Sequence, residues 1–208
     1  DYFAKKFLNL DKHRFEIKQE LIAKSGLFIV KKRYGMKIIN DNGVKVNKLH
    51  VKGLDLVRSN FPKAMGELLK NVLEDILATV PKEKIDERII NFKESMKLVD
   101  FDRIAMPTGI NNLKKYSDGK AGKFTKFAKG APAHIKAAIT YNDLLRHFGV
   151  GKKYEKISNS EKIKWVYLRQ NELGLESCGY KGYEDPPQII DFIKKNIDYK
   201  KMYAQMLE

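Results

Sequence analysis

An apolar stripe with helical spacing runs through the second quarter of the chain, between two prolines. Its members recur three and four positions apart, as one face of a helix requires: Met65, Leu68, Leu69, Val72, Leu73, Ile76, Leu77 and Val80. Pro62 suits the first turn of a helix, where a missing N–H is harmless, and Ser59 or Asn60 could cap it. Pro81 ends it. The stripe therefore predicts an amphipathic helix that buries one face.

A second stripe follows Pro81 and consists of Ile85, Ile89, Phe92, Met96 and Val99. Two helices joined by a tight proline turn predict an antiparallel pair whose apolar faces bury each other. Further helices are expected over residues 132–148 and after Pro186-Pro187, and a strand is expected over residues 163–168.

The first 58 residues are patterned as strands instead. The apolar run at residues 27–30 resumes at Met36 after a charged interruption, and residues 40–43 (Asn-Asp-Asn-Gly) supply turn chemistry. A hairpin or small antiparallel sheet is predicted over residues 14–58. A small sheet followed by a mainly helical part with a short strand region is an α+β fold, with a boundary near residue 58.

Composition narrows the class of protein. The 208 residues are 43% hydrophobic, so the chain can build a core, yet no apolar run reaches the ~18–20 residues of a membrane span. The lone Cys178 cannot form an internal disulfide, and no secretory signal is visible, so a cytoplasmic location is expected. A net charge of +15 then points to a nucleic acid, an acidic membrane surface or an acidic protein as partner.

The positive charge is concentrated in two blocks. Residues 1–58 carry 14 basic and 6 acidic side chains, and residues 103–153 carry 11 and 2. In contrast, residues 59–102 carry 7 and 9, and residues 154–208 carry 9 of each. Because charge that serves only solubility would be spread more evenly, the blocks favour a localised site for a polyanion, formed as two surfaces or as one surface from two segments.

The first block contains Lys31-Lys32-Arg33-Tyr34, directly after an apolar run. In an extended segment, Lys32 and Tyr34 would point to one face and Lys31 and Arg33 to the other. One face could then meet a nucleic acid while the other pairs with carboxylates inside the protein. The polar end of an ordinary strand would have the same pattern, so this run alone leaves both interpretations open.

The second block contains four lysines spaced three apart: Lys120, Lys123, Lys126 and Lys129. In a helix they would turn away from one another, at ~100° per residue, so residues 107–130 with their glycines are predicted to form an irregular or extended loop. Its lysines could follow successive phosphates, and the alternative is a solvated loop. His134 and Lys136 follow at the start of the next predicted helix, where free N–H groups also favour anions.

Other candidate sites are incomplete. Asp100-Phe101-Asp102 offers two carboxylates without neighbouring ligands, and the four histidines lack metal-ligand spacing. Residues 149–153 depart from a phosphate loop, because Arg146 replaces the first glycine and no Ser or Thr follows Gly151-Lys152. Cys178 is expected to be a buried small residue. No metal site and no complete catalytic set is predicted in this chain.

The run Phe28-Ile29-Val30-Lys31-Lys32-Arg33-Tyr34-Gly35 resembles the Lys-Lys-Arg-Tyr element of family B DNA polymerases, especially the phage enzymes. In that family the element lies in the palm and touches the minor-groove side of the primer–template. Residues 52–63, 130–142 and 162–168 are similar, in the same order, to the palm-to-thumb crossing, the duplex-gripping thumb segment and a thumb strand. These four matches are collinear, which makes them more specific together than any one alone, and the resemblance extends over almost the whole chain.

The resemblance implies that residues 1–58 are the C-terminal end of the palm and residues 59–208 the thumb of a replicative DNA-directed DNA polymerase. Glu20 resembles a palm carboxylate near the metal-binding aspartates, with a supporting role only, since Lys18 occupies a nearby position that is acidic in some members of the family. Those aspartates and the fingers helix have no counterpart in this sequence. The residues expected to contact duplex DNA are Lys31, Lys32, Arg33, Tyr34, Lys52, Arg58, His134 and Lys136, which lie in the matching segments, together with Lys120, Lys123, Lys126 and Lys129, which are selected by their spacing and charge.

The resemblance also implies partners. These are primer–template duplex DNA, the remaining N-terminal portion of the polymerase (exonuclease, fingers and the rest of the palm) and a sliding clamp. The complete enzyme would bind Mg²⁺ at a two-metal site, whereas this segment is expected to bind no cofactor and to be an inactive part of a nucleotidyltransferase. If the chain is phage-encoded, it acts in the bacterial host cytoplasm.

The ends of the chain also suggest an expectation. Because it begins without Met and stops inside an apparent helix, a fragment, a split-gene product or a cut domain is expected. The main alternative is a free-standing nucleic-acid-binding accessory module without sequence preference. A scaffold for acidic proteins or membranes is the third class, but no basic amphipathic helix with aromatic anchors supports it.

Overall fold

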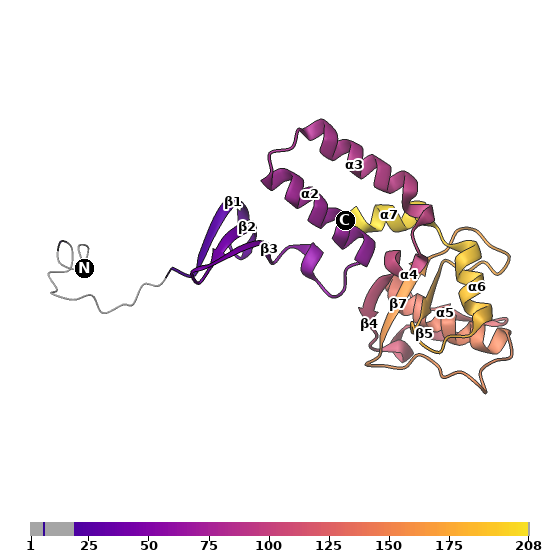
Figure 1. Cartoon of the computed structure of the whole chain (residues 1–208). Helices are drawn as coiled ribbons and strands as arrows, with labels where there is room; N and C mark the ends of the chain where they lie inside the picture. Colours follow the sequence, from indigo (N-terminus) through magenta and orange to yellow (C-terminus); the bar gives the residue numbers. More distant parts are fainter. Residues whose placement is uncertain (1–5, 7–18, 208) are drawn as a thin grey trace. The chain divides into compact units, whose positions relative to one another are not determined.

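The computed structural model describes residue 6 and residues 19–207, except for the side chains of residues 120 and 121 (Figure 1). The chain divides into two compact units after Gly53. Helices and small antiparallel sheets together confirm the predicted α+β fold. Within the described part, no helix is long and apolar enough to cross a membrane. The predicted sheet region at residues 14–18 lies outside the described residues.

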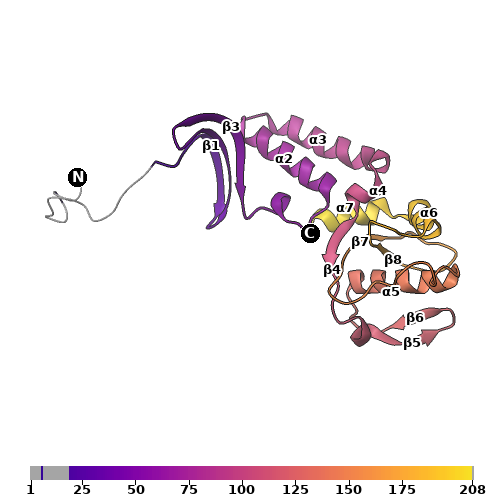
Figure 2. The ribbon, with the colours of Figure 1, turned by 60° about the horizontal axis from the view of Figure 1, so that its bottom comes forward.

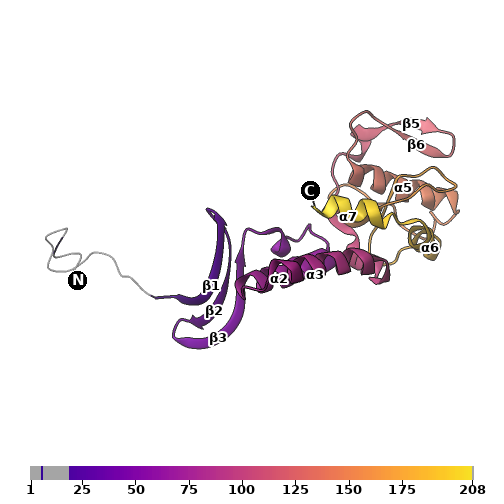
Figure 3. The ribbon, with the colours of Figure 1, turned by 90° about the horizontal axis from the view of Figure 1, so that it is seen from above.

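The first unit is a three-stranded antiparallel sheet in sequence order, visibly curved in Figure 3. Its strands are β1 (Leu21–Val30), β2 (Arg33–Asp41) and β3 (Val44–Lys52). The β2–β3 turn is formed by Asn42 and Gly43, both at positive φ, as their residue types predicted. Ile38 is fully buried, whereas Phe28 remains 69% exposed. The predicted small sheet is therefore confirmed, and part of its apolar surface faces solvent.

The second unit begins with a helical hairpin. After the short 3₁₀ turn η1 (Asp55–Val57), the predicted helices are confirmed as α2 (Lys63–Leu77) and α3 (Lys82–Ser95), which continues into η2 (Met96–Leu98). The expected mutual burial of the pair is confirmed only in part, because the stripe residues Ile85, Ile89 and Phe92 of α3 are half-buried and no residue of this helix is fully buried. α2 instead directs Met65 and Leu68 into the main core, together with Met96 and Ile104.

A second sheet and further helices form the rest of this core. The sheet order is β4-β7-β8, with antiparallel pairs throughout. The predicted helices at residues 132–148 and after residue 186 and the strand at 163–168 are confirmed. The elements are α4 (Phe101–Ile104), β4 (Met106–Gly109), α5 (Ala133–His147), β7 (Lys162–Tyr167), β8 (Ser177–Tyr180), α6 (Pro187–Asn196) and α7 (Tyr199–Leu207).

The lysine-rich region is more regular than predicted. After η3 (Leu113–Tyr116), strands β5 (Ser117–Ala121) and β6 (Phe124–Phe127) pair as a hairpin around Gly122 and Lys123. Of the two predicted alternatives, the extended one is confirmed for these strands and the irregular loop is wrong, because backbone pairing extends both arms. Figure 2 shows α5 between this hairpin and the β4-β7-β8 sheet, and α5 contacts β6 of the hairpin as well as β7 and β8.

Candidate nucleic-acid interface

Lys31 and Lys32 form the turn between β1 and β2. Lys32 has a φ of 66°, a left-handed conformation that costs an L-residue about 1 kcal/mol. Lys31, Lys32 and Arg33 are exposed, and within the described residues none of the three has an ion-pair partner. The predicted alternation of faces is wrong for the two lysines, since they turn rather than extend. The predicted pairing with internal carboxylates is also absent from the described residues.

Tyr34 supports the turn from within the sheet. It is half-buried, and its ring lies 5.7 Å from the ring of Phe28 and 5.9 Å from that of His50. It is paired with Lys52 of β3, so the structure brings Lys52 to the same end of the sheet as the turn. Tyr34 thus uses much of its ring for packing.

Gly53 closes this end of the sheet by a very close backbone approach. It has a φ of 69°, and a Cβ placed there would lie 2.2 Å from the carbonyl oxygen of Lys32. Only glycine permits such an approach without displacing the turn. The conformation of the basic turn therefore depends on Gly53, which follows β3 and is distant from the turn in sequence. The residues around Lys32 give no indication of this dependence.

Glu20 is not gathered with the turn residues, and Arg58 lies outside the first unit. Glu20 precedes β1, and its carbonyl accepts a 2.7 Å hydrogen bond from the Asn42 N–H, which places it at the opposite end of the sheet from Lys32. Arg58 belongs to the second unit and pairs with Asp55 at 2.7 Å. Its charge is therefore partly neutralised.

The β5–β6 hairpin displays the lysines of the second basic block. Lys123 occupies the turn, Lys126 lies on β6 and Lys129 follows it, and all three are exposed. Phe124 and Phe127 are half-buried against the core. The hairpin therefore exposes these lysines while its two phenylalanines pack against the core. Lys120 belongs to β5, where its backbone takes part in the pairing with β6.

The start of α5 contributes less free charge than predicted. Burial lowers the pKa of His134 below its ordinary value of 6.5, so the imidazole is neutral near pH 7 and offers hydrogen bonds only. Lys136 is half-buried, 3.5 Å from a carboxylate oxygen of Glu176 and 5.7 Å from the Phe127 ring centroid. Its ammonium group is thus partly committed inside the protein.

The carboxylates that resembled a metal site have structural roles. Asp100 caps α4 by accepting a 3.1 Å hydrogen bond from the Asp102 N–H. Asp102 accepts from the Tyr180 hydroxyl at 3.0 Å and from Lys164. Burial alone would raise the pKa of Asp102, but these two donors outweigh it and lower the pKa below 3.8. Within the described residues, no three His, Cys, Asp or Glu side chains are grouped as metal ligands.

The other two incomplete motifs are also structural. The N–H groups of Val150 and Gly151 donate to the Leu145 carbonyl at 3.0 and 3.1 Å, so this glycine-rich segment ends α5 rather than cradling a phosphate. Cys178 is buried on β8, as predicted, and burial raises the pKa of its thiol. These backbone N–H groups are therefore not available to a phosphate, and the Cys178 thiol is not activated as a nucleophile.

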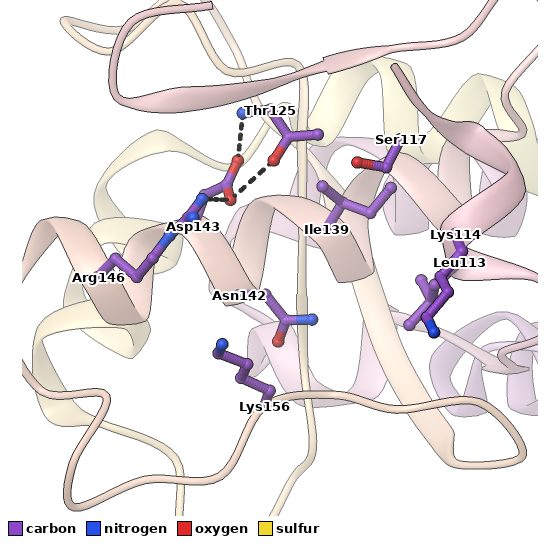
Figure 4. Close-up of a pocket in the computed structure, with 9 residues that line it drawn as sticks. All are labelled: Leu113, Lys114, Ser117, Thr125, Ile139, Asn142, Asp143, Arg146 and Lys156. Atoms are coloured by element: carbon purple, nitrogen blue, oxygen red, sulfur yellow. Dashed lines mark hydrogen bonds and ion pairs between the residues drawn. The ribbon is translucent and has the colours of Figure 1, made fainter. Parts of the chain in front are cut away.

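A groove between the hairpin, η3 and α5 contains an acidic residue, Asp143, that belongs to no sequence motif (Figure 4). The groove has a volume of about 220 Å³, and Lys114, Arg146 and Lys156 lie on its wall. The side chain of Asp143 is 4% exposed, and its carboxylate joins Thr125 to Arg146. In the sequence Asp143 stood out only as one of two acids in the second basic block.

Backbone strain and positive charge coincide at Lys32, and one substitution separates their effects. Replacing Lys32 with glycine should stabilise the sheet by about 0.5–1 kcal/mol, because glycine adopts positive φ freely, yet weaken duplex binding by removing one exposed cation. Denaturant unfolding and fluorescence anisotropy with labelled duplex measure the two effects. Asn42→Gly, at φ 50° in the other turn, is the matched control and should leave binding unchanged. Unchanged binding by Lys32→Gly would exclude Lys32 from the interface.

Comparison with known proteins identifies the family. Residues 3–208 match the model of DNA polymerase family B. The chain is 26% identical over 184 residues to the DNA-directed DNA polymerase of Enterobacteria phage T4, covering 86% of this chain and 19% of that protein. It is 24% identical over 185 residues to the corresponding enzyme of Escherichia phage RB69, covering 88% and 19%.

A solved structure agrees at the level of the fold. The family B DNA polymerase from the hyperthermophilic archaeon Pyrobaculum calidifontis matches with a TM-score of 0.52 at 15% identity, over 100% of this chain and 24% of that one. The chain thus spans about a fifth of the length of the curated relatives that it matches. Because the family model covers nearly every residue, this chain belongs to DNA polymerase family B.

Proposed function

We propose that this chain is the palm-end and thumb portion of a replicative DNA polymerase, with residues 1–58 and 59–208 in these two roles, and that it holds primer–template duplex during synthesis. The observation that carries the proposal is the display of exposed cations on two backbone-defined turns. These are the β1–β2 turn with Lys31 and Lys32 and the β5–β6 turn with Lys123.

The chemistry of these two turns suits binding that does not depend on sequence. Ammonium groups on exposed turns act as point charges for phosphates, and such contacts position a duplex without reading its bases. Lys32 can also donate to the acceptors that every base pair presents in the minor groove. The role of Tyr34 is then mainly to support the turn, since its ring packs between Phe28 and His50.

Phosphoryl transfer is assigned to the complete polymerase. In the complete polymerase, two Mg²⁺ ions would neutralise the negative charge that develops on the phosphate oxygens. Binding two such ions requires several carboxylates, and Glu20 provides only one. Glu20 is exposed, and the described residues offer no grouped ligands around it. The proposed partners are therefore duplex DNA, the rest of the polymerase and, in the assembled enzyme, a sliding clamp. The phage relatives favour action in a bacterial cytoplasm.

Primer extension tests this role. The chain is mixed with the upstream portion of the polymerase encoded in the same source, which carries the exonuclease, the fingers and the palm aspartates. Rescue of template-directed synthesis by the mixture, with neither portion active alone, is expected. Failure of two folded portions to extend a primer would favour the second candidate, a free-standing nucleic-acid-binding module, for which the same exposed cations would suffice.

A further inference from the structure

Asp143 on α5 is a buried carboxylate that accepts hydrogen bonds from outside its own helix. Its side chain is 4% exposed, and a charge so buried must be paired to be tolerated. The Thr125 N–H donates to Oδ2 at 2.6 Å, the Thr125 hydroxyl donates to Oδ1 at 3.0 Å, and Arg146 pairs with Oδ1 (Figure 4). Two of these three donors thus come from one residue of β6.

These bonds lie in the middle of a series of contacts along α5. The ring of Phe124 lies 5.7 Å from that of His147, near the helix end, and the Phe127 ring lies 5.7 Å from the Lys136 ammonium, near its start. Thr125 bonds to Asp143 between them. β6 therefore runs antiparallel to α5, and the central contact of the series is the one made by hydrogen bonds to a carboxylate.

The hairpin depends on contacts outside itself for stability. β5 and β6 pair only with each other among the described strands, and an isolated two-stranded hairpin is marginally stable in water. Thr125 lies two residues after Lys123 and directly before Lys126. Bonds to both its backbone N–H and its side chain therefore fix the part of the hairpin that bears these exposed lysines.

We infer that Asp143 is a positioning residue, which holds the β5–β6 hairpin on α5 so that Lys123 and Lys126 are ordered before duplex DNA binds. This inference rests on the proposed function. An untethered hairpin would have to be ordered during binding, at a cost in conformational entropy that lowers affinity. The pair with Arg146, three residues along the same helix, does not reach the hairpin and cannot explain the bonds to Thr125.

Replacing Asp143 with asparagine separates positioning from charge. The substitution raises the net charge by one, so a purely electrostatic effect would tighten duplex binding. A positioning role predicts the opposite, about tenfold weaker binding at constant salt. Amide hydrogen exchange should report the cause, because the Thr125 N–H should exchange roughly tenfold faster or more once its charged acceptor is gone.

The effect of Asp143→Asn on duplex binding should require Lys123 and Lys126. In a chain that already carries Lys123→Gln and Lys126→Gln, Asp143→Asn should weaken binding little further. Thr125→Val is the second variant, for use if Asp143→Asn does not fold, and it removes only the hydroxyl bond at 3.0 Å. Tyr180→Phe is its matched control, because it removes a hydroxyl–carboxylate bond of the same length, to Asp102, away from the hairpin.

The outcomes are distinct. Weaker binding by Asp143→Asn and Thr125→Val but not by Tyr180→Phe, with faster Thr125 exchange, is the expected result. Equal or tighter binding by Asp143→Asn, or an equally large weakening in the background without both lysines, overturns the inference. Absence of salt-dependent duplex binding by the unaltered chain would instead contradict the proposed function itself, whatever the exchange data show.

Discussion

Replacing Lys123, Lys126 and Lys129 together with glutamine is expected to reduce the slope of log K against log salt concentration for duplex binding by about 0.9 for each phosphate that is no longer neutralised. All three are exposed, and the described residues include no ion-pair partner for them. If each touches one phosphate, the slope falls by about 2.7, and affinity at low salt falls by roughly tenfold or more. Fluorescence anisotropy over a series of salt concentrations measures both.

A matched triple substitution separates place from charge. Lys70, Lys84 and Lys97 are also exposed, but they belong to the mildly acidic segment of residues 59–102. Replacing these three with glutamine removes the same charge and should change the slope little, because they are not proposed to touch phosphates. Equal changes in the two triple variants would mean that only net charge matters. An unchanged slope in the hairpin variant would remove the hairpin from the DNA surface.

Gly53→Ala is expected to destabilise the first unit by at least about 2 kcal/mol and to weaken duplex binding. The added Cβ would lie 2.2 Å from the Lys32 carbonyl oxygen, at a φ of 69° that already strains alanine. Either the turn or the end of β3 must move. Hydrogen exchange of the β2 and β3 amides should show weaker pairing, and anisotropy should show weaker binding.

Gly43→Ala provides the control within the same sheet. Gly43 also has a positive φ, 89°, but nothing lies within 4 Å of an added Cβ. This variant should therefore cost only the strain of about 1 kcal/mol and leave duplex binding intact, since it lies in the turn remote from Lys32. Equal effects of the two substitutions would show that the close approach at Gly53 does not shape the basic turn.

Long helices bounded by prolines and turns marked by Asn and Gly could be predicted from the sequence. The stripe between Pro62 and Pro81 predicted α2, and Asn42-Gly43 marked a turn, because their signals lie within a few residues. β8 had no such signal, since its four residues, Ser-Cys-Gly-Tyr, are too short to alternate and are all buried. Its position depends on pairing with β7 and on contact with α5, which are properties of the folded chain.

The candidate site divides in the same way. Exposed lysines could be selected from spacing and charge, so the residues at both turns were found. The residues that hold the two turns in place could not be predicted. Gly53 contacts Lys32, and Asp143 binds Thr125, between positions that are far apart in sequence and share no sequence pattern. The hairpin could not be predicted from the lysines three apart, since that spacing matches neither the helical nor the strand period.

Salt-dependent binding of the unaltered chain to a primer–template duplex decides whether this chain holds duplex DNA. Anisotropy is recorded with labelled duplex across salt concentrations, with polyglutamate of similar charge as competitor. If the two basic turns contact phosphates, log K should fall linearly with log salt, with the slope of several phosphate contacts, and polyglutamate should compete poorly. Binding that is insensitive to salt, or equal affinity for duplex and polyglutamate, would contradict a surface built to hold duplex DNA.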